Sequence, residues 1–173
     1  PVSYYAFQML YWCGIREGEL LALTAGDFDF KNKTVTINKS YQRLHGEDVI
    51  TPPKTAKSNR TIKMPNFLCE EMQEYITMFY SAGENDRIFP ISKSYLHHEM
   101  TRGSEAAGVK RIRIHDLRHS HVSLLIDQGY QAVAIADRVG HESIDITYRY
   151  AHLYPSKQNE MVNTLDEIWK GEK

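Results

Sequence analysis

The sequence has no long apolar run, and none of its apolar segments approaches the roughly 18 residues that a membrane-spanning helix needs. Its opening residues, PVSYYAFQMLYWCG, show neither the basic lead nor the small-residue cleavage site of a signal peptide. The sequence also begins without Met and directly in a helix-like pattern. We therefore expect a fragment of a longer protein.

Cysteine is scarce, with only Cys13 and Cys69 in 173 residues. Both lie in apolar, helix-like surroundings, which is typical of small buried hydrophobic side chains. Neither has a second Cys or a His at the spacing of a metal site. This usage fits a reducing, cytosolic compartment.

A surplus of charge of one sign is also missing, since the formal net charge is -1. This argues against a uniformly basic nucleic-acid binder, but the charges are unevenly distributed. Residues 31–63 hold eight Lys and Arg against two acidic residues, and residues 102–118 hold five against two. Such asymmetry predicts one cationic face for a polyanion. The alternative is that these are solvated charges of strands and loops.

Apolar periodicity predicts a mainly helical chain with one small sheet. A first helix ends at Gly14, and a short second helix buries Leu20, Leu21 and Leu23. Alternation then predicts strands over residues 33–42, 49–54 and 58–65, arranged as a small antiparallel meander.

The rest of the sequence predicts further helices. One spans residues 65–83, with Asn66 as N-cap and Gly83 past its end, and others lie within 93–108, 114–129, 131–140 and 142–152. A last helix lies in 156–173. There are no repeats and no long linker, so we expect a single α+β, mainly α domain over 1–173 with a three-stranded antiparallel sheet.

Arg16 is the first candidate functional residue, because it stands at the first turn of a helix, where the macrodipole does not favour a cation. An anion that the side chain must meet explains this position, although an exposed Arg near a helix start is common. Glu19 lies three residues on, on the same helical face, and is placed to hold the Arg or a nearby His.

The segment IHDLRHSH places His115, Arg118 and His119 on one helical face. Arg carries a permanent charge on a planar fork that matches two phosphate oxygens, and a neighbouring His can donate one more hydrogen bond. The alternatives are histidines that brace the core, or zinc bound by His115 and His119. Arg118 between them is a poor neighbour for a dication, so we expect no metal.

Three further groups add to this set. His141 follows Gly140 at a turn between helices, where its side chain can point into a cleft. Lys54 and Lys57 compete at the tip between two strands. Tyrosines stand close together near the end of the chain, at positions 148, 150 and 154.

Together these groups fit phosphoryl transfer without a metal. Arg and His donors stabilise the charge that gathers on a phosphodiester under attack. A tyrosine can attack and form a phosphotyrosyl link, and nearby cations favour ionisation of a phenol whose ordinary pKa is about 10. A lysine can protonate the departing sugar oxygen.

In this order the motifs resemble those of tyrosine recombinases of the phage integrase type. GIREGELLAL resembles the first arginine box, PPKTAKSNRTIKMP the lysine hairpin, IHDLRHSH the His-x-x-Arg box and VGHESIDITYRYAH the Gly-His…Tyr box. The resemblance covers nearly the whole chain, and Val139 is a minor departure because the family often has Leu there. It implies the catalytic domain of a DNA breaking-rejoining enzyme. The catalytic residues it implies are Arg16, Lys54, His115, Arg118, His141 and Tyr150, with Glu19 and His119 in support.

The resemblance also implies a mechanism and partners. Tyr150 would attack a DNA phosphate and leave a 3′-phosphotyrosine and a free 5′-hydroxyl, with no cofactor. Expected partners are double-stranded DNA, other protomers in a synaptic tetramer, and accessory DNA-bending or excision factors, in the bacterial cytoplasm at the nucleoid. The N-terminal DNA-binding domains that such enzymes usually carry are not in these residues. Predicted DNA contacts within the basic segments are Lys57, Arg60, Arg111 and Arg113.

Three alternatives remain at this point. A type IB topoisomerase uses a similar set of residues to relax supercoils. A non-catalytic helix-turn-helix regulator would explain residues 131–152 but would give no role to Arg16, Lys54 or Arg118. The tail helix in 156–173 packs either on its own domain or on a neighbouring protomer.

Overall fold

The computed structural model describes residues 2–53, 55–78, 83, 85–150, 152 and 158–170. Helix α1 (Val2–Cys13) buries side chains at three- and four-residue intervals, from Ala6 through Met9 and Leu10 to Cys13. This spacing keeps one face of the helix in the core. The helix ends as predicted at Gly14, which has a φ of +62°. A Cβ added there would lie 2.5 Å from the ring of His121.

Helix α2 (Glu17–Ala22) follows after three residues and buries Leu20 and Leu21, with Leu23 buried just beyond its end. A capping box begins it, because Glu19 accepts the backbone N–H of the N-cap residue, Arg16 (2.8 Å). A 3₁₀ turn, η1 (Ala25–Asp27), leads from this helix into the strands.

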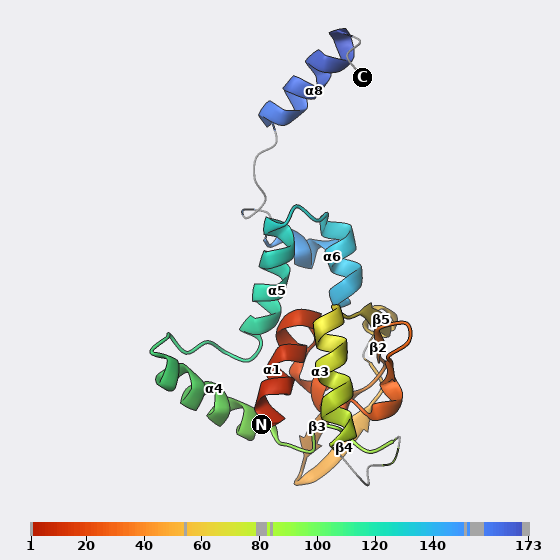
Figure 1. Ribbon diagram of the computed structural model, residues 1–173, viewed down its shortest axis with the longest axis vertical. Coiled ribbons are helices and arrows are strands. Elements are labelled where there is room, and N and C mark those ends of the chain that lie inside the picture. Colours follow the sequence, from red (N-terminus) through yellow and green to blue (C-terminus); the bar gives the residue numbers. More distant parts are fainter. Residues whose placement is uncertain are drawn as a thin grey trace.

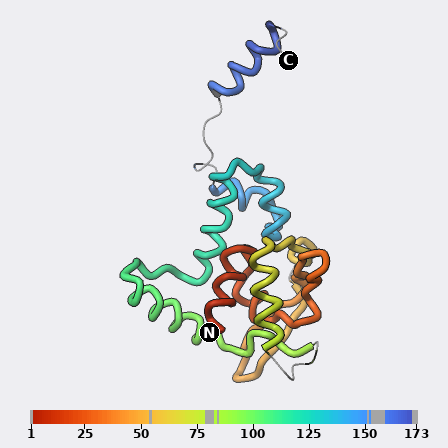
Figure 2. The backbone as a smooth tube through the Cα atoms, viewed as in Figure 1, coloured from red at the N-terminus to blue at the C-terminus, as the bar shows by residue number. Residues whose placement is uncertain are grey.

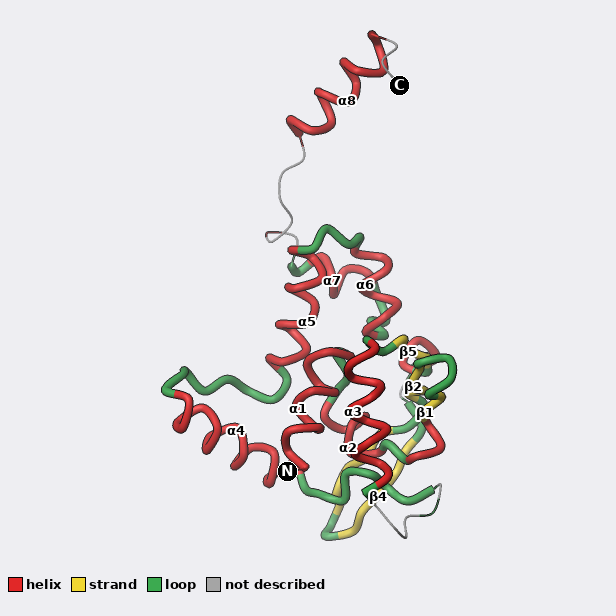
Figure 3. The backbone as a smooth tube through the Cα atoms, viewed as in Figure 1, coloured by secondary structure: helices red, strands yellow, loops and turns green. Residues whose placement is uncertain are grey.

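The strands form two small antiparallel sheets (Figure 3). β1 (Phe28–Asp29), β2 (Thr34–Ile37) and β5 (Arg60–Lys63) make one sheet in the order β1-β2-β5, with Val35 opposite both Phe28 and Ile62. β3 (Ser40–Leu44) and β4 (Glu47–Thr51) make a separate hairpin. A short 3₁₀ turn, η2 (Ala56–Ser58), precedes β5.

The prediction of one strand over residues 33–42 is therefore wrong in detail. The chain leaves β2 after Ile37 and starts β3 at Ser40, in the other sheet. Between them, Lys39 forms an ion pair with Asp27 (Nζ–Oδ1 2.6 Å). This contact lies within a stretch whose alternation predicts one continuous strand.

The remaining helices follow the predicted order. They are α3 (Asn66–Thr77), α4 (Lys93–Ala107), α5 (Asp116–Asp127), α6 (Ala132–Val139), α7 (Ile144–Tyr148) and α8 (Gln158–Lys170). Pro65, not Asn66, occupies the N-cap of α3. α7 is much shorter than the predicted helix over 142–152.

Two hydrophobic clusters organise the chain. The larger one joins α1, α2, α3 and the three-stranded sheet, and the smaller one consists of Val122, Ile126, Ile135 and Val139 of α5 and α6. Figure 1 shows α1 and α3 beside the strands, with α5 and α6 against one end of this body and α8 apart from it. Figure 2 traces the chain from the red α1 to the blue C-terminal residues along the same path. Arg118 links the two regions, because it donates hydrogen bonds to Gly14 O after α1 and to Val139 O of α6.

Candidate active site

Arg16 and Arg60 share one buried carboxylate. Glu19 is 5% exposed and accepts Arg16 Nη1 at 2.8 Å, Arg60 Nη1 at 3.1 Å and Arg60 Nη2 at 2.9 Å. Burial alone would raise the pKa of Glu19, but hydrogen bonds and charge from Arg60 and Arg16 outweigh it and hold the pKa below its usual value. The carboxylate therefore stays ionised and fixes both guanidinium groups.

Arg118 is anchored by backbone carbonyls. Its Nη1 donates to Gly14 O at 2.7 Å and its Nη2 to Val139 O at 2.6 Å, and the residue is 4% exposed. Both carbonyls lie at the C-terminal ends of helices, where the macrodipole favours a cation. Burial and the nearby Arg16 lower the pKa of Arg118 to about 9, so the group is charged at neutral pH. Two of its five N–H groups are used by these carbonyls, which leaves three for an anion.

The turn after α6 links the arginines to His141. Gly140 has a φ of +68°, and its carbonyl accepts Arg16 Nη2 at 3.3 Å. His141 is buried, and its Nδ1 shares a hydrogen bond of 2.8 Å with Thr147 Oγ1. Burial and the charges of Arg118, Arg16 and Arg60 lower the pKa of His141 to about 4, so the ring is neutral near pH 7.

Tyr150 lies close to these arginines and His141, in the turn after α7. Its N–H donates to Thr147 O at 3.0 Å, and its ring packs on the smaller cluster. His119 Nδ1 is hydrogen-bonded to the Tyr150 hydroxyl, and the His115 ring stands edge-on to His119 with centroids 4.7 Å apart. The structure thus brings the predicted nucleophile beside the His-x-x-Arg box of the same chain.

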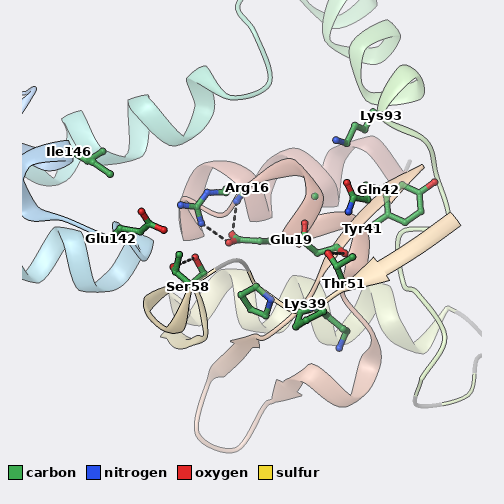
Figure 4. A pocket seen from close by; sticks show the side chains of 15 residues that line it. Arg16, Glu19, Lys39, Tyr41, Gln42, Thr51, Ser58, Lys93, Glu142 and Ile146 are labelled. Atoms are coloured by element: carbon green, nitrogen blue, oxygen red, sulfur yellow. Dashed lines mark hydrogen bonds and ion pairs between the residues drawn. The ribbon is translucent and has the colours of Figure 1, made fainter. Parts of the chain in front are cut away.

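A cleft of about 450 Å³ opens beside Arg16 (Figure 4). Tyr41, Gln42 and Thr51 of the β3–β4 hairpin line one side, and Glu142 and Ile146 line the other. Arg16 reaches across to Glu19 with 38% of its own side chain exposed. It is therefore both anchored and open to a ligand.

The predicted DNA-contact residues fall into two groups. Lys57, Arg111 and Arg113 are exposed, and Lys57 borders a small cavity of about 190 Å³ with Gly140 and His141. Arg60 differs, because its side chain is only 6% exposed and donates to Glu19 and to Arg138 O (3.0 Å). The geometry of Arg60 is that of an internal support, and its contact with DNA stays a prediction. Lys54 and Tyr154 lie outside the described residues.

Two supporting residues were missed from the sequence. Thr147 is fully buried against His141, and Arg138 joins three elements through Lys63 O, Trp12 O and His121 Nε2, each within 3.1 Å. A Thr three residues before the chosen Tyr and an Arg at the end of a helix carry no sequence signal for these contacts. Only the fold shows them.

The part of the chain that the structure describes contains no group of three His, Cys, Asp or Glu able to hold a metal ion. No helix in those residues is long and apolar enough to cross a membrane. The set therefore offers hydrogen-bond donors, permanent cations and one phenol, which suits an anionic phosphate.

Comparison with known proteins matches residues 2–157 to the phage integrase family. The ICEBs1 integrase of Bacillus subtilis (strain 168) is 33% identical over 94% of this chain and 48% of its own length. The integrase of Staphylococcus phage L54a is 32% identical over 90% of this chain and 49% of its own. The chain spans about half the length of the curated relatives it matches.

Solved structures show the same fold. The Tn1549 transposon integrase in complex with a circular intermediate DNA superposes with a TM-score of 0.78 at 20% identity, covering 96% of this chain and 58% of that one. The XerA recombinase superposes with a TM-score of 0.70 at 22% identity, covering 94% and 56%. These likenesses confirm the predicted α+β catalytic-domain fold.

Proposed function

The chain belongs to the phage integrase family, and on that premise we propose that it cleaves and rejoins DNA strands through a covalent link between Tyr150 and a DNA 3′-phosphate. The proteins it resembles include the ICEBs1 integrase, a phage integrase and, in fold, a transposon integrase, so the substrate we propose is the end of a mobile element. The acting compartment is the bacterial cytoplasm, where such DNA lies.

One observation carries this proposal: groups from four separate segments converge on one place. Arg16, Arg118 and His141 meet through the carbonyls of Gly14, Val139 and Gly140, and Tyr150 stands beside His119. The phosphate would lie among the guanidinium groups and His141, whose fixed N–H groups stabilise charge on the non-bridging oxygens. Such preorganised donors need no reorganisation during the reaction.

The bond changes balance without a cofactor. Tyr150 Oη attacks phosphorus, the bond from phosphorus to the 5′-oxygen breaks, and that oxygen takes a proton from a general acid. We propose Lys54 for the acid, with Lys57 as the competitor. A 5′-bridging phosphorothiolate, whose sulfur leaves without a proton, should rescue Lys54→Ala. Rescue of Lys57→Ala instead would move the acid to Lys57.

The test is a nicked suicide duplex carrying the end sequence of the element that encodes the chain. We expect a covalent protein–DNA adduct with the wild type and none with Tyr150→Phe, whereas Tyr148→Phe and Tyr154→Phe should retain adduct. Loss of the adduct in Tyr148→Phe alone would give the nucleophile to Tyr148. Reversible binding without any adduct would favour a non-catalytic DNA-binding protein.

Helix α8 supports a second protomer as partner. Residues 159–170 are all exposed, and the helix carries an apolar face on which Trp169 is 90% exposed. The other members of this face are Met161, Val162, Leu165 and Ile168, each more than half exposed. An apolar helical face of this kind is usually buried against another surface, and we propose that this surface belongs to another copy.

This proposal predicts that association of protomers can be disturbed without loss of the cleavage chemistry. Leu165→Glu with Ile168→Glu should weaken the association of DNA-bound protomers, measured by analytical ultracentrifugation. Adduct formation by a single protomer should survive. Unchanged association would favour a tail that packs on its own domain.

A further inference from the structure

Before DNA is bound, the hydroxyl of Tyr150 already has a partner. His119 Nδ1 is hydrogen-bonded to Tyr150 Oη across 31 residues of sequence. His119 is fixed by α5, and Tyr150 is fixed by the turn after α7 and by packing on the smaller cluster. Two independently positioned groups therefore meet at the atom that must react.

The surroundings of Tyr150 favour the protonated form of its phenol. Burial raises the pKa of the phenol, and Asp116 adds to the rise, while the charges of Arg118 and Arg149 oppose it without reversing it. The nucleophile in an attack on phosphorus is the phenolate, so the proton must be removed as the reaction proceeds. A base within hydrogen-bond reach meets the geometric requirement for this step.

We propose, resting on the function proposed above, that His119 is a catalytic residue that accepts the Tyr150 proton at Nδ1 while Oη attacks phosphorus. The imidazole becomes imidazolium, and the 5′-oxygen leaves with a proton from the general acid. On rejoining, a 5′-hydroxyl returns its proton to the general acid and attacks phosphorus, the bond from phosphorus to Tyr150 Oη breaks, and His119 gives its proton back to Oη. Protons and bonds balance over the cycle.

The charges around His119 are compatible with this role. Asp116, on the same helix, interacts electrostatically with His119, and so do His115 and His141. Arg149, beside Tyr150, and Arg16, near His115, add positive charge from other elements. A bound DNA phosphate would bring negative charge to this cationic cluster.

The other two histidines have different surroundings. His141 Nδ1 is engaged by Thr147, and its ring is buried among the arginines, which suits a donor to the phosphate. His115 contacts the edge of the His119 ring and is exposed. These positions leave His119 as the imidazole whose nitrogen contacts the nucleophile, and His115 as a matched control.

The decisive variant is His119→Asn, because its amide oxygen can still accept the phenol hydrogen bond but takes no proton at neutral pH. Adduct formation on the suicide duplex is followed in a single turnover from pH 5.5 to 9.5. We expect a loss of about 10²- to 10⁴-fold near pH 7, the usual range for general acid–base catalysis. The rate of the variant should then rise steadily with pH as the phenol ionises by itself.

A second measurement replaces Tyr150 with 3,5-difluorotyrosine, whose phenol is more acidic. The rate of His119→Asn should recover strongly, while the wild-type rate changes little. His115→Asn should lose rate without either the new pH dependence or the recovery. A His119→Asn protein with the wild-type pH profile and no recovery overturns the assignment. Absence of an adduct with the wild type, or an adduct with Tyr150→Phe, overturns the proposed function instead.

Discussion

The two halves of the site are held in different ways. The arginine cradle, consisting of Arg16, Glu19, Arg60 and Arg118, is fixed by buried hydrogen bonds that join α1, α2, α5, α6 and β5. The tyrosine segment, residues 141–150, is a turn with a five-residue helix. Tyr150, the proposed nucleophile, rests on a small apolar cluster and one imidazole.

This difference separates two requirements of the proposed reaction. The groups that stabilise charge must not move, because preorganisation is the source of their effect. The tyrosine must approach phosphorus, form a bond and later leave, so a short segment with few anchors suits it. Substitutions in the cradle should therefore cost more than substitutions that loosen the tyrosine segment.

The largest effect expected in the cradle is that of Arg118→Lys. The charge remains, but a lysine cannot reproduce a fork that binds Gly14 O, Val139 O and a phosphate together. We expect adduct formation to fall about 10²- to 10³-fold, as for loss of an oxyanion donor. Single-turnover cleavage measures it, with Arg102→Lys on exposed α4 as the control. A near-normal rate would show that the fork is not needed.

A second variant tests whether Arg60 supports the cradle or only the fold. Arg60→Met leaves Glu19 with one partner, and breaking a buried ion pair costs about 3–5 kcal/mol of the free energy of unfolding. Glu19→Gln in the same protein removes the buried charge that has lost Arg60 and should restore much of that stability. Cleavage should stay low because Arg16 has lost its carboxylate anchor. Urea unfolding and cleavage are measured together, and joint recovery would contradict the supporting role.

The junction of the two halves is Gly140. A Cβ there would lie 2.9 Å from Lys57 O and 3.0 Å from Arg60 Nη1, in addition to the strain of φ +68°. Gly108 has a similar φ of +65° with no atom within 4 Å of an added Cβ. Gly108→Ala should cost about 1–2 kcal/mol of stability and no activity, whereas Gly140→Ala should also lower cleavage. Equal effects on cleavage would show that the close approach does not matter.

The smallest effect lies beneath the site. Burial and Arg138 lower the pKa of His121 to about 4. Between pH 6.5 and 4 the unfolded chain binds a proton that the folded chain does not, so His121 makes stability fall as the pH falls through this window. The loss is on the order of 3 kcal/mol. His121→Gln can still accept from Arg138 and should flatten the dependence, unlike His98→Gln on the exposed face of α4. Chemical unfolding from pH 4 to 8 measures this, and an unchanged slope would contradict it.

Much of this arrangement could be predicted from local sequence patterns. The ends of α1 and α6 follow from Gly14 and Gly140, and the helical spacing within IHDLRHSH places Arg118 and His119. The choice of Tyr150 among three tyrosines came from the resemblance of VGHESIDITYRYAH to the Gly-His…Tyr box, and the structure puts that residue against His119.

The rest depends on contacts between distant segments. At the break between β2 and β3, Lys39 pairs with Asp27, a contact that alternation does not show. From the sequence, Arg60 is expected to be an exposed charge on a strand. In the structure it instead donates a hydrogen bond to Glu19, 41 residues earlier. Thr147 has no motif of its own, and its role appears only where α7 turns back over His141.

The partners of Arg118 in the folded chain are peptide oxygens, and a peptide oxygen is the same whatever codon specifies its residue. Single amino-acid replacements at Val139 change the side chain but leave the acceptor in place. At Val139 the anchor is thus largely insulated from mutation, whereas at Gly14 an added Cβ would lie 2.5 Å from the ring of His121. The anchor is sensitive chiefly to substitutions that move the C-terminal ends of α1 and α6.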